Sequence, residues 1–163
     1  MKNLILSFIL FSTVYHVNAQ INLENSYAYS ASVTQVNDED YFYYLMDVGL
    51  SQCRIYTKNH ELLKTIGLSV PAGYYLSDIR FVGKGIFNTD DLIELLYIYE
   101  KYVPTETGYY YQYGLSVVNE NGTSLLSLPN GGWAEIKEVA NENKLLAYMY
   151  TYNPEGYYNV ITN

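Results

Sequence analysis

Asn88-Thr89-Asp90-Asp91-Leu92-Ile93-Glu94-Leu95-Leu96 is the stretch of sequence that decides the fold. A polar turn at 88–91 leads directly into a segment in which apolar residues occupy both alternating faces. This pattern is typical of a strand that is buried between two neighbouring sheets, because a strand with one solvated face alternates apolar and polar residues. The stretch therefore predicts a β-strand at about 92–99 that is sandwiched between neighbouring sheets.

The same arrangement occurs in two other places along the chain. Asn37-Asp38-Glu39-Asp40 precedes an apolar run at 41–45, and Asn141-Glu142-Asn143-Lys144 precedes another at 145–149. Asn88 follows Asn37 by 51 residues, and Asn141 follows Asn88 by 53 residues. A period of this length accommodates one four-stranded supersecondary unit and lies near the period of propeller blades.

Each period predicts four short strands that are joined by tight turns. In the second period the strands are expected at 77–82, 92–99, 111–118 and 124–128, with Asn121-Gly122 as the strongest hairpin signal. The strand after each Asn-led turn carries one apolar face, made of Phe42, Tyr44, Met46 and Val48, then Ile93, Leu95, Tyr97 and Tyr99, then Leu146, Tyr148, Tyr150 and Tyr152. We therefore expect an all-β fold of antiparallel four-stranded meander repeats, β-propeller-like, with fewer than three blades.

Composition agrees with a globular all-β domain. Hydrophobic residues make up 49% of the 163 residues and charged residues 16%, while 21 residues are tyrosine, which favours strands. Cys53 is the only cysteine, so no disulfide forms within the chain, and its apolar surroundings predict a small buried side chain rather than a nucleophile.

The N-terminus has the order of features found in a secretory signal peptide. Lys2 is followed by an apolar run at 4–14 and by Val17-Asn18-Ala19, which suits cleavage after Ala19. The run is too short for a permanent membrane span, and no later stretch is long enough. We expect a signal peptide at 1–19, a single domain at 20–163 without membrane insertion, and a secreted or cell-surface location.

The acidic charge narrows the class of partner. The formal net charge is −8, and it becomes −9 when Lys2 leaves with the leader. A surface of this sign repels phosphate backbones, so we expect no nucleic-acid partner. Neutral, cationic or protein partners are favoured instead.

The repeats resemble blades of a β-propeller, and the segments that carry this resemblance are 53–66, 87–94 and 118–122. The whole chain, leader included, is similar to secreted proteins of the Bacteroidota in which tyrosine-rich repeats precede a type IX secretion sorting domain. This resemblance implies a secreted or cell-surface location, and it supplies no catalytic residue. No sorting domain follows here, and Asn163 falls within the third strand of the third period. The chain is expected to be a fragment, a truncated product, or a module that completes its last sheet with its own strand near 27–36.

Aromatic residues supply the candidate ligand-binding site. Strand alternation places Tyr109, Tyr111 and Tyr113 on one face, and Trp133 and Tyr74 occupy matching loop positions in two repeats. Exposed rings of this kind suit stacking on the sugar rings of a glycan or anchoring a cell-surface protein. The alternative is that the rings pack between sheets as part of the core.

Carboxylates supply the candidate for an enzymatic function. Asp90 or Asp91 with Glu94 would serve as the acid and base of a glycan-cleaving hydrolase, or as oxygen ligands of calcium. The corresponding turns lack the same charges, which favours a turn role. His60 is expected to be an exposed turn residue, and the residues predict no metal site and no cofactor. The sequence therefore predicts an exported binding or structural module, with the hydrolase as the alternative.

Overall fold

The computed structural model describes residues 23–35, 40–153, 155, 156 and 158–162. The predicted signal peptide at 1–19 lies outside these residues. The described residues form β-strands and turns, with no helix among them.

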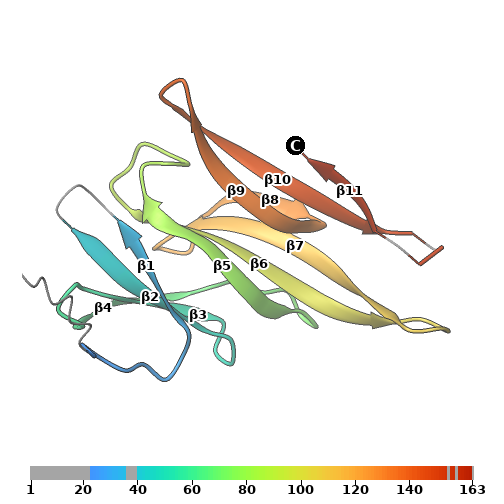
Figure 1. The fold of residues 1–163 in the computed structure, drawn as a ribbon, viewed down its shortest axis with the longest axis horizontal. Helices are drawn as coiled ribbons and strands as arrows, with labels where there is room; N and C mark the ends of the chain where they lie inside the picture. Colours follow the sequence, from blue (N-terminus) through green and yellow to red (C-terminus); the bar gives the residue numbers. More distant parts are fainter. Residues whose placement is uncertain (1–22, 36–39, 154, 157, 163) are drawn as a thin grey trace, which may run out of the picture.

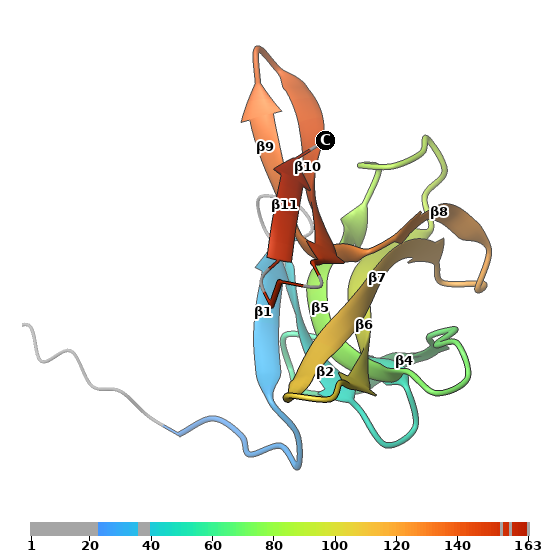
Figure 2. The same cartoon turned by 90° about the vertical axis from the view of Figure 1, so that its right-hand side faces the viewer.

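The strands form three antiparallel sheets that follow one another along the chain (Figures 1 and 2). The first sheet contains β1 (Ala31–Gln35), β2 (Tyr41–Asp47), β3 (Gln52–Tyr56) and β4 (Leu62–Gly67). The second contains β5 (Tyr75–Lys84), β6 (Ile93–Pro104), β7 (Tyr109–Asn119) and β8 (Ser124–Pro129). The third contains β9 (Gly131–Val139), β10 (Glu142–Tyr152) and β11 (Tyr158–Thr162). In each sheet the spatial order of the strands is the order of the sequence or its reverse, which is the meander topology.

The strands that follow the three Asn-led turns occupy equivalent places. They are β2, β6 and β10, and each is the second strand of its sheet in chain order. This placement confirms the predicted antiparallel meander repeats. The strand near 27–36 does not complete the last sheet, because β1 pairs with β2 in the first sheet.

The second sheet lies at the centre, and its strand β6 is covered on both faces. Ile93 to Tyr99 are seven consecutive residues that are all buried, none more than 8% exposed. Leu95 and Tyr97 pack into a core shared with the first sheet. Leu96 and Ile98 pack into a second core that includes Ala134 of the third sheet. The sandwiched position predicted for the strand at 92–99 is therefore confirmed, whereas the equivalent strands β2 and β10 are mostly only partly buried.

The predicted apolar faces are confirmed in part. Phe42, Tyr44 and Met46 pack against the core between the first and second sheets, but Val48 lies in the turn after β2 and is exposed. In the first half of β10, Leu145 and the buried Ala147 face the central sheet in place of the predicted Leu146. In the second half the predicted face is confirmed, since Tyr150 contacts Tyr113 and Tyr152 stacks on Tyr110. The third sheet covers the side of β6 that the first sheet leaves open. At this side the side chains of β10 that turn inward near its start are Leu145 and Ala147.

Buried polar side chains close two of the turns. Asp47, at the end of β2, accepts a hydrogen bond from the Leu50 amide at 3.1 Å and pairs with Arg54 at 2.6 Å. Asn119, at the end of β7, accepts hydrogen bonds from the amides of Asn121 and Thr123. In the predicted hairpin turn Gly122 has a positive φ of 80°, a conformation that favours glycine.

Cys53 is fully buried in the first core, as its sequence context predicts. Burial raises the pKa of its thiol to about 12, so the sulfur stays protonated at neutral pH. The side chain therefore acts as a small hydrophobe.

Two leucines provide a test of the central strand. We expect Leu95→Ala to lower the free energy of unfolding by about 2–5 kcal/mol, because Leu95 is fully buried and its truncation leaves a cavity. Leu50→Ala, in a turn where Leu50 is 62% exposed, should change it by less than about 0.5 kcal/mol. Urea unfolding of both variants measures the difference, and equal losses would contradict the assignment of β6 as the doubly buried strand.

Candidate ligand-binding surface

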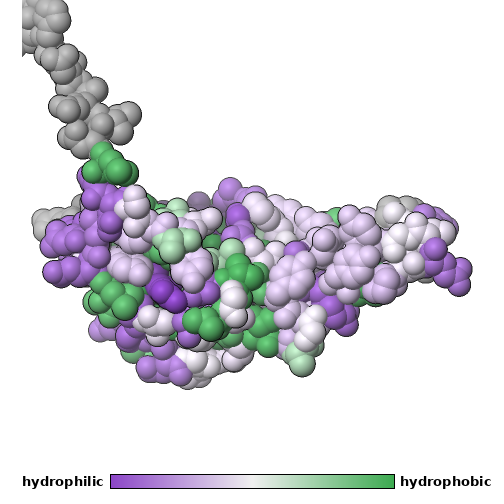
Figure 3. Space-filling model, turned by 90° about the horizontal axis from the view of Figure 1, so that it is seen from below, coloured by the Kyte–Doolittle hydropathy of each residue, from purple (hydrophilic) through white to green (hydrophobic). Residues whose placement is uncertain are grey.

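The hairpin of β6 and β7 extends beyond the rest of the central sheet. These strands stay paired from Glu94 and Asn119 out to Pro104 and Tyr109, whereas β8 pairs with β7 from Gly114 to Val118. The free end of the hairpin projects from the molecule in Figure 1. Seen from below, this elongated end is covered largely by pale residues of intermediate hydropathy, the class to which tyrosine belongs (Figure 3).

Four tyrosines lie together on one side of this extension. Tyr102 pairs across the hairpin with Tyr111, and Tyr109 and Tyr113 follow at alternate positions of β7, so all four side chains leave the same face. We call Tyr102, Tyr109, Tyr111 and Tyr113 the tyrosine face. The structure thus brings together the three tyrosines that alternation predicts as a group, and adds Tyr102.

The rings of the tyrosine face contact one another in a short row that is two rings wide at its outer part, where Tyr102 also meets Tyr111 edge to face at 6.2 Å. Tyr102 and Tyr109 are stacked, with centroids 5.0 Å apart and an angle of 29° between the rings. Tyr109 and Tyr111 meet edge to face at 5.7 Å, and Tyr111 and Tyr113 lie 6.4 Å apart. Tyr102 is 51% exposed and Tyr109 is 57% exposed. Apolar ring surface is therefore open to solvent at the outer end of the row.

The third sheet supports the inner end of the row. Tyr113 contacts Tyr150 and Tyr158 at 5.5 and 6.1 Å. The Tyr158 hydroxyl accepts a hydrogen bond from the Tyr111 amide at 2.7 Å and donates one to the Tyr111 carbonyl at 2.9 Å. A phenol both donates and accepts, so this single group satisfies both backbone atoms at the edge of β7. These contacts hold the hairpin against β11.

Two tyrosines at this surface, Tyr113 and Tyr75, have a raised pKa. Burial first, and then the neighbouring Tyr158 and Glu100, raise the pKa of Tyr113 to about 12. Partial burial and hydrogen bonds to Glu100 and Tyr111 likewise raise the pKa of Tyr75, which pairs with Glu100 across β5 and β6. The surface therefore offers phenol donors and acceptors, with the Glu100 carboxylate beside them.

Tyr74 and Trp133 are not part of the tyrosine face. Tyr74 packs against the core between the first and second sheets, where its ring meets Tyr99 edge to face at 5.4 Å. Trp133 lies on β9, with the guanidinium carbon of Arg80 3.5 Å from its ring centroid. Within the described ranges Trp133 makes no ring contact with the tyrosine face. The five predicted binding residues thus occupy three separate places.

Tyr102 is the residue that the sequence analysis missed. The predicted strand ended at Tyr99 because the next residues, Glu100 and Lys101, interrupt the apolar pattern. If the strand is continued past Tyr99, alternation places Tyr102 on the face of β6 that carries Leu96, Ile98 and Glu100.

The candidate acid and base residues hold the loop between β5 and β6. Glu94 is fully buried, and its carboxylate accepts hydrogen bonds from the amides of Ile86, Phe87 and Asn88 at 2.8 to 3.1 Å. Asp90 accepts a hydrogen bond from the Leu92 amide at 2.9 Å, as expected of a turn aspartate. Asp91 is exposed on the same loop. The Glu94 carboxylate therefore holds the backbone of the loop and is not accessible to a substrate.

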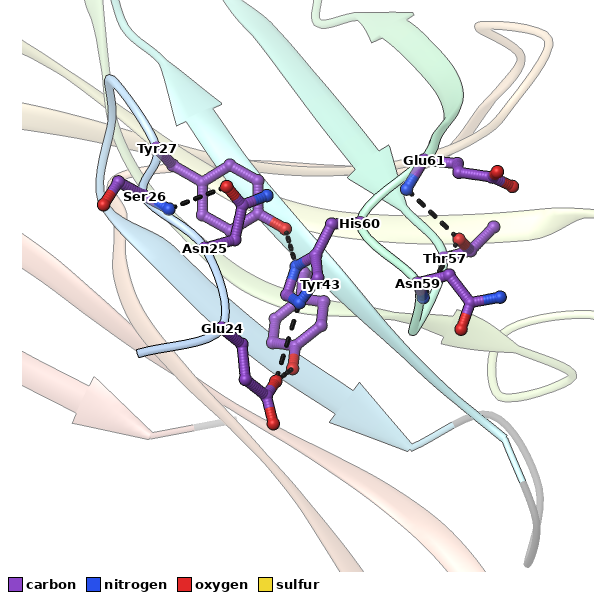
Figure 4. Close-up of polar contacts among 9 residues, drawn as sticks. All are labelled: Glu24, Asn25, Ser26, Tyr27, Tyr43, Thr57, Asn59, His60 and Glu61. Atoms are coloured by element: carbon purple, nitrogen blue, oxygen red, sulfur yellow. Dashed lines mark hydrogen bonds and ion pairs between the residues drawn. The ribbon is translucent and has the colours of Figure 1, made fainter. Parts of the chain in front are cut away.

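His60 lies in a turn, as predicted, but its side chain is not exposed. Figure 4 shows it between Tyr27 and Tyr43, with 19% of the side chain accessible. Its Nδ1 is hydrogen-bonded to the Tyr27 hydroxyl at 2.7 Å, and its ring stacks on Tyr43 at 4.8 Å. The Nε2 atom lies 3.5 Å from Oε2 of Glu24. These contacts attach the segment before β1 to the β3–β4 turn. They could not be predicted from the sequence, because the residues in contact with His60 lie far from it along the chain.

Across the described residues no group of three or more His, Cys, Asp and Glu side chains is placed to hold a metal ion. In the same part of the chain no helix has the length and apolar character needed to cross a membrane.

Comparisons with known proteins identify no relative: no family model, no curated protein and no solved structure matches the chain.

A pair of variants in the β5–β6 loop tests the role of Glu94. Glu94→Ala should lower the free energy of unfolding by at least about 3 kcal/mol, because three part-buried amides lose a charged acceptor and a hydrogen bond to a charged group is worth about 1.5–3 kcal/mol. Asp91→Ala, on the exposed part of the loop, should cost less than about 0.5 kcal/mol. Denaturant unfolding measures both, and a Glu94→Ala protein of unchanged stability would show that the carboxylate does not anchor the loop.

Proposed function

We propose that this protein is a binding module that captures glycans through the tyrosine face. The observation that carries the proposal is the stacked, half-exposed pair of Tyr102 and Tyr109 at the end of the β6–β7 hairpin. Large aromatic rings exposed side by side are uncommon on a surface that has no ligand, since burying them is favourable.

The chemistry of the surface suits a sugar. One face of a sugar ring consists of C–H groups, which stack on a phenol ring, while its hydroxyls need hydrogen-bond partners. The tyrosine hydroxyls donate and accept, and the Glu100 carboxylate accepts. Because Tyr102, Tyr109 and Tyr111 contact one another and Tyr113 continues the group, the rings form one continuous aromatic surface, which favours an oligosaccharide over a single sugar.

Charge and predicted location support the same ligand class. The net charge of −8 disfavours phosphate-rich ligands such as nucleic acids, but it does not oppose neutral glycans. The predicted signal peptide supports a secreted or cell-surface role, where such glycans occur. The hydrolase alternative receives less support, because Glu94 is fully buried and bonded to the backbone of its own loop.

The test compares glycan binding by the wild-type protein and by variants of the two outermost rings. On a glycan array, Tyr102→Ala and Tyr109→Ala should each weaken binding at least about fivefold, the effect of losing more than 1 kcal/mol at an aromatic anchor. Their melting temperatures should fall by no more than about 4 °C, because both rings are half exposed. Tyr29→Ala is the matched control: Tyr29 is 39% exposed, lies on the segment before β1, and its loss should leave binding unchanged.

Two outcomes would contradict the proposal. If both variants lose glycan binding and melting temperature together, the two rings stabilise the fold as part of the core and do not form a binding surface. No binding to any glycan, with capture of a cell-surface protein that needs Tyr109, would replace the glycan with a protein partner.

A further inference from the structure

A second candidate site lies between the central sheet and β9, on a different part of the molecule from the tyrosine face. It is a cavity of about 430 Å³, within the range of about 300–1,000 Å³ that is usual for small-molecule sites. Its apolar lining comes from the side chains Phe81, Leu96, Ala134 and Ile136. Its polar lining comes from the side chains Arg80, Glu135 and Lys137. The cavity therefore combines an apolar floor with charged groups at its margin.

Two β-bulges shape the margin of this cavity. The pairing of β5 with β6 skips Arg80, since Ile79 pairs with Tyr97 and Phe81 with the adjacent Leu96. The pairing of β9 with β10 skips Gly132, next to Trp133. A bulge changes the direction in which a strand presents its side chains. Here the two irregular positions bring Arg80 onto the ring of Trp133, with 3.5 Å between guanidinium carbon and ring centroid.

The Arg80 guanidinium is held in place but has hydrogen-bonding capacity left. The Trp133 ring covers one of its flat faces, and its Nη1 donates to Asp78 at 3.1 Å. Its Nε is buried and has no hydrogen-bond partner within the described residues. A buried unpaired donor is costly, about 1–3 kcal/mol, so an acceptor that reaches it is favoured. Asp78 takes Nη1, so a bidentate partner has to use the edge formed by Nε and Nη2, and the side chains that cover Nε must shift to admit it.

The other charges of the margin already neutralise one another. Lys137 pairs with Glu135 at 2.8 Å, and the Trp133 indole donates to the same carboxylate at 3.4 Å. The hydrogen bonds from Lys137 and Trp133 hold the pKa of Glu135 below its usual value, so Glu135 stays ionised and paired. Arg80 is also ion-paired, with Asp78, but among these charged side chains of the described residues it is the one with a buried donor that still lacks an acceptor.

We propose that this cavity binds a small organic carboxylate with an apolar body. The carboxylate pairs with the Nε and Nη2 edge of Arg80, and the apolar body lies on Phe81, Leu96 and Ile136. A planar guanidinium fits a carboxylate with two parallel hydrogen bonds, a geometry that an alcohol does not supply. This site does not depend on the tyrosine face, and either proposal stands if the other fails.

Trp133 provides a direct signal for the test, since it is the only tryptophan of the chain. Phenylacetate is titrated into the full chain while tryptophan-selective fluorescence is recorded, with 2-phenylethanol as the uncharged analogue and glucuronate as a carboxylate without an apolar body. Phenylacetate should give a saturable change and raise the melting temperature, as a ligand of the native state does. The other two compounds should bind at least about tenfold more weakly, since each lacks one half of the recognition.

Variants locate the carboxylate. Arg80→Gln should weaken phenylacetate binding at least about tenfold, whereas Lys144→Gln, an exposed lysine of β10, should leave it unchanged. The wild-type comparison of phenylacetate with 2-phenylethanol needs no variant and decides the matter if Arg80→Gln does not fold. No saturable response to phenylacetate, an equal response to the alcohol or to glucuronate, or undiminished binding by a folded Arg80→Gln protein would overturn the proposal.

Discussion

Burial of β6 on both of its faces is the constraint on which the rest of the structure depends. A three- or four-stranded sheet of this size has marginal stability in water unless its apolar face packs against another element. The first and third sheets each have one such face, and both bury it against the central sheet, at Leu95 and Tyr97 on one side and at Leu96 and Ile98 on the other. The three sheets thus form one interdependent stack. With no disulfide available, this packing is the source of its stability.

Buried polar groups then define the loops between the strands. Backbone amides of a neighbouring turn donate hydrogen bonds to a side-chain oxygen of Asp47, of Glu94 and of Asn119. Glu120 joins the sheets, since it accepts hydrogen bonds from Lys64 of β4 and from the Ile93 amide. A buried acceptor with several donors fixes the local backbone, because leaving any of them unpaired is costly. The strand ends are consequently well determined, and the β6–β7 hairpin starts from a rigid base.

Both candidate sites follow from the way the third sheet covers the central one. Tyr113 and Phe81 pack against the same core, which lies between these two sheets. Toward the free end of the hairpin the cover stops, and the tyrosine face continues from Tyr113 outward into solvent. Toward β5, the bulged strand β9 leaves the cavity beside Arg80 and Trp133. Incomplete coverage of one apolar sheet face therefore produces two surfaces of different chemistry.

The sequence by itself determined the fold class, the repeat and the topology, because strand alternation and turn residues are local properties that recur with the period. It also grouped Tyr109, Tyr111 and Tyr113, since residues two apart on a strand share a face whatever surrounds it. Only the tertiary structure decided which face meets which sheet, and hence that Leu145 and Ala147 point inward and that Tyr74 and Trp133 lie apart. It likewise decided that Glu94 is buried and that His60 is enclosed by Tyr27 and Tyr43. The physical reason is that burial depends on contacts between strands distant in the chain, and alternation distinguishes two faces without saying what will cover either of them.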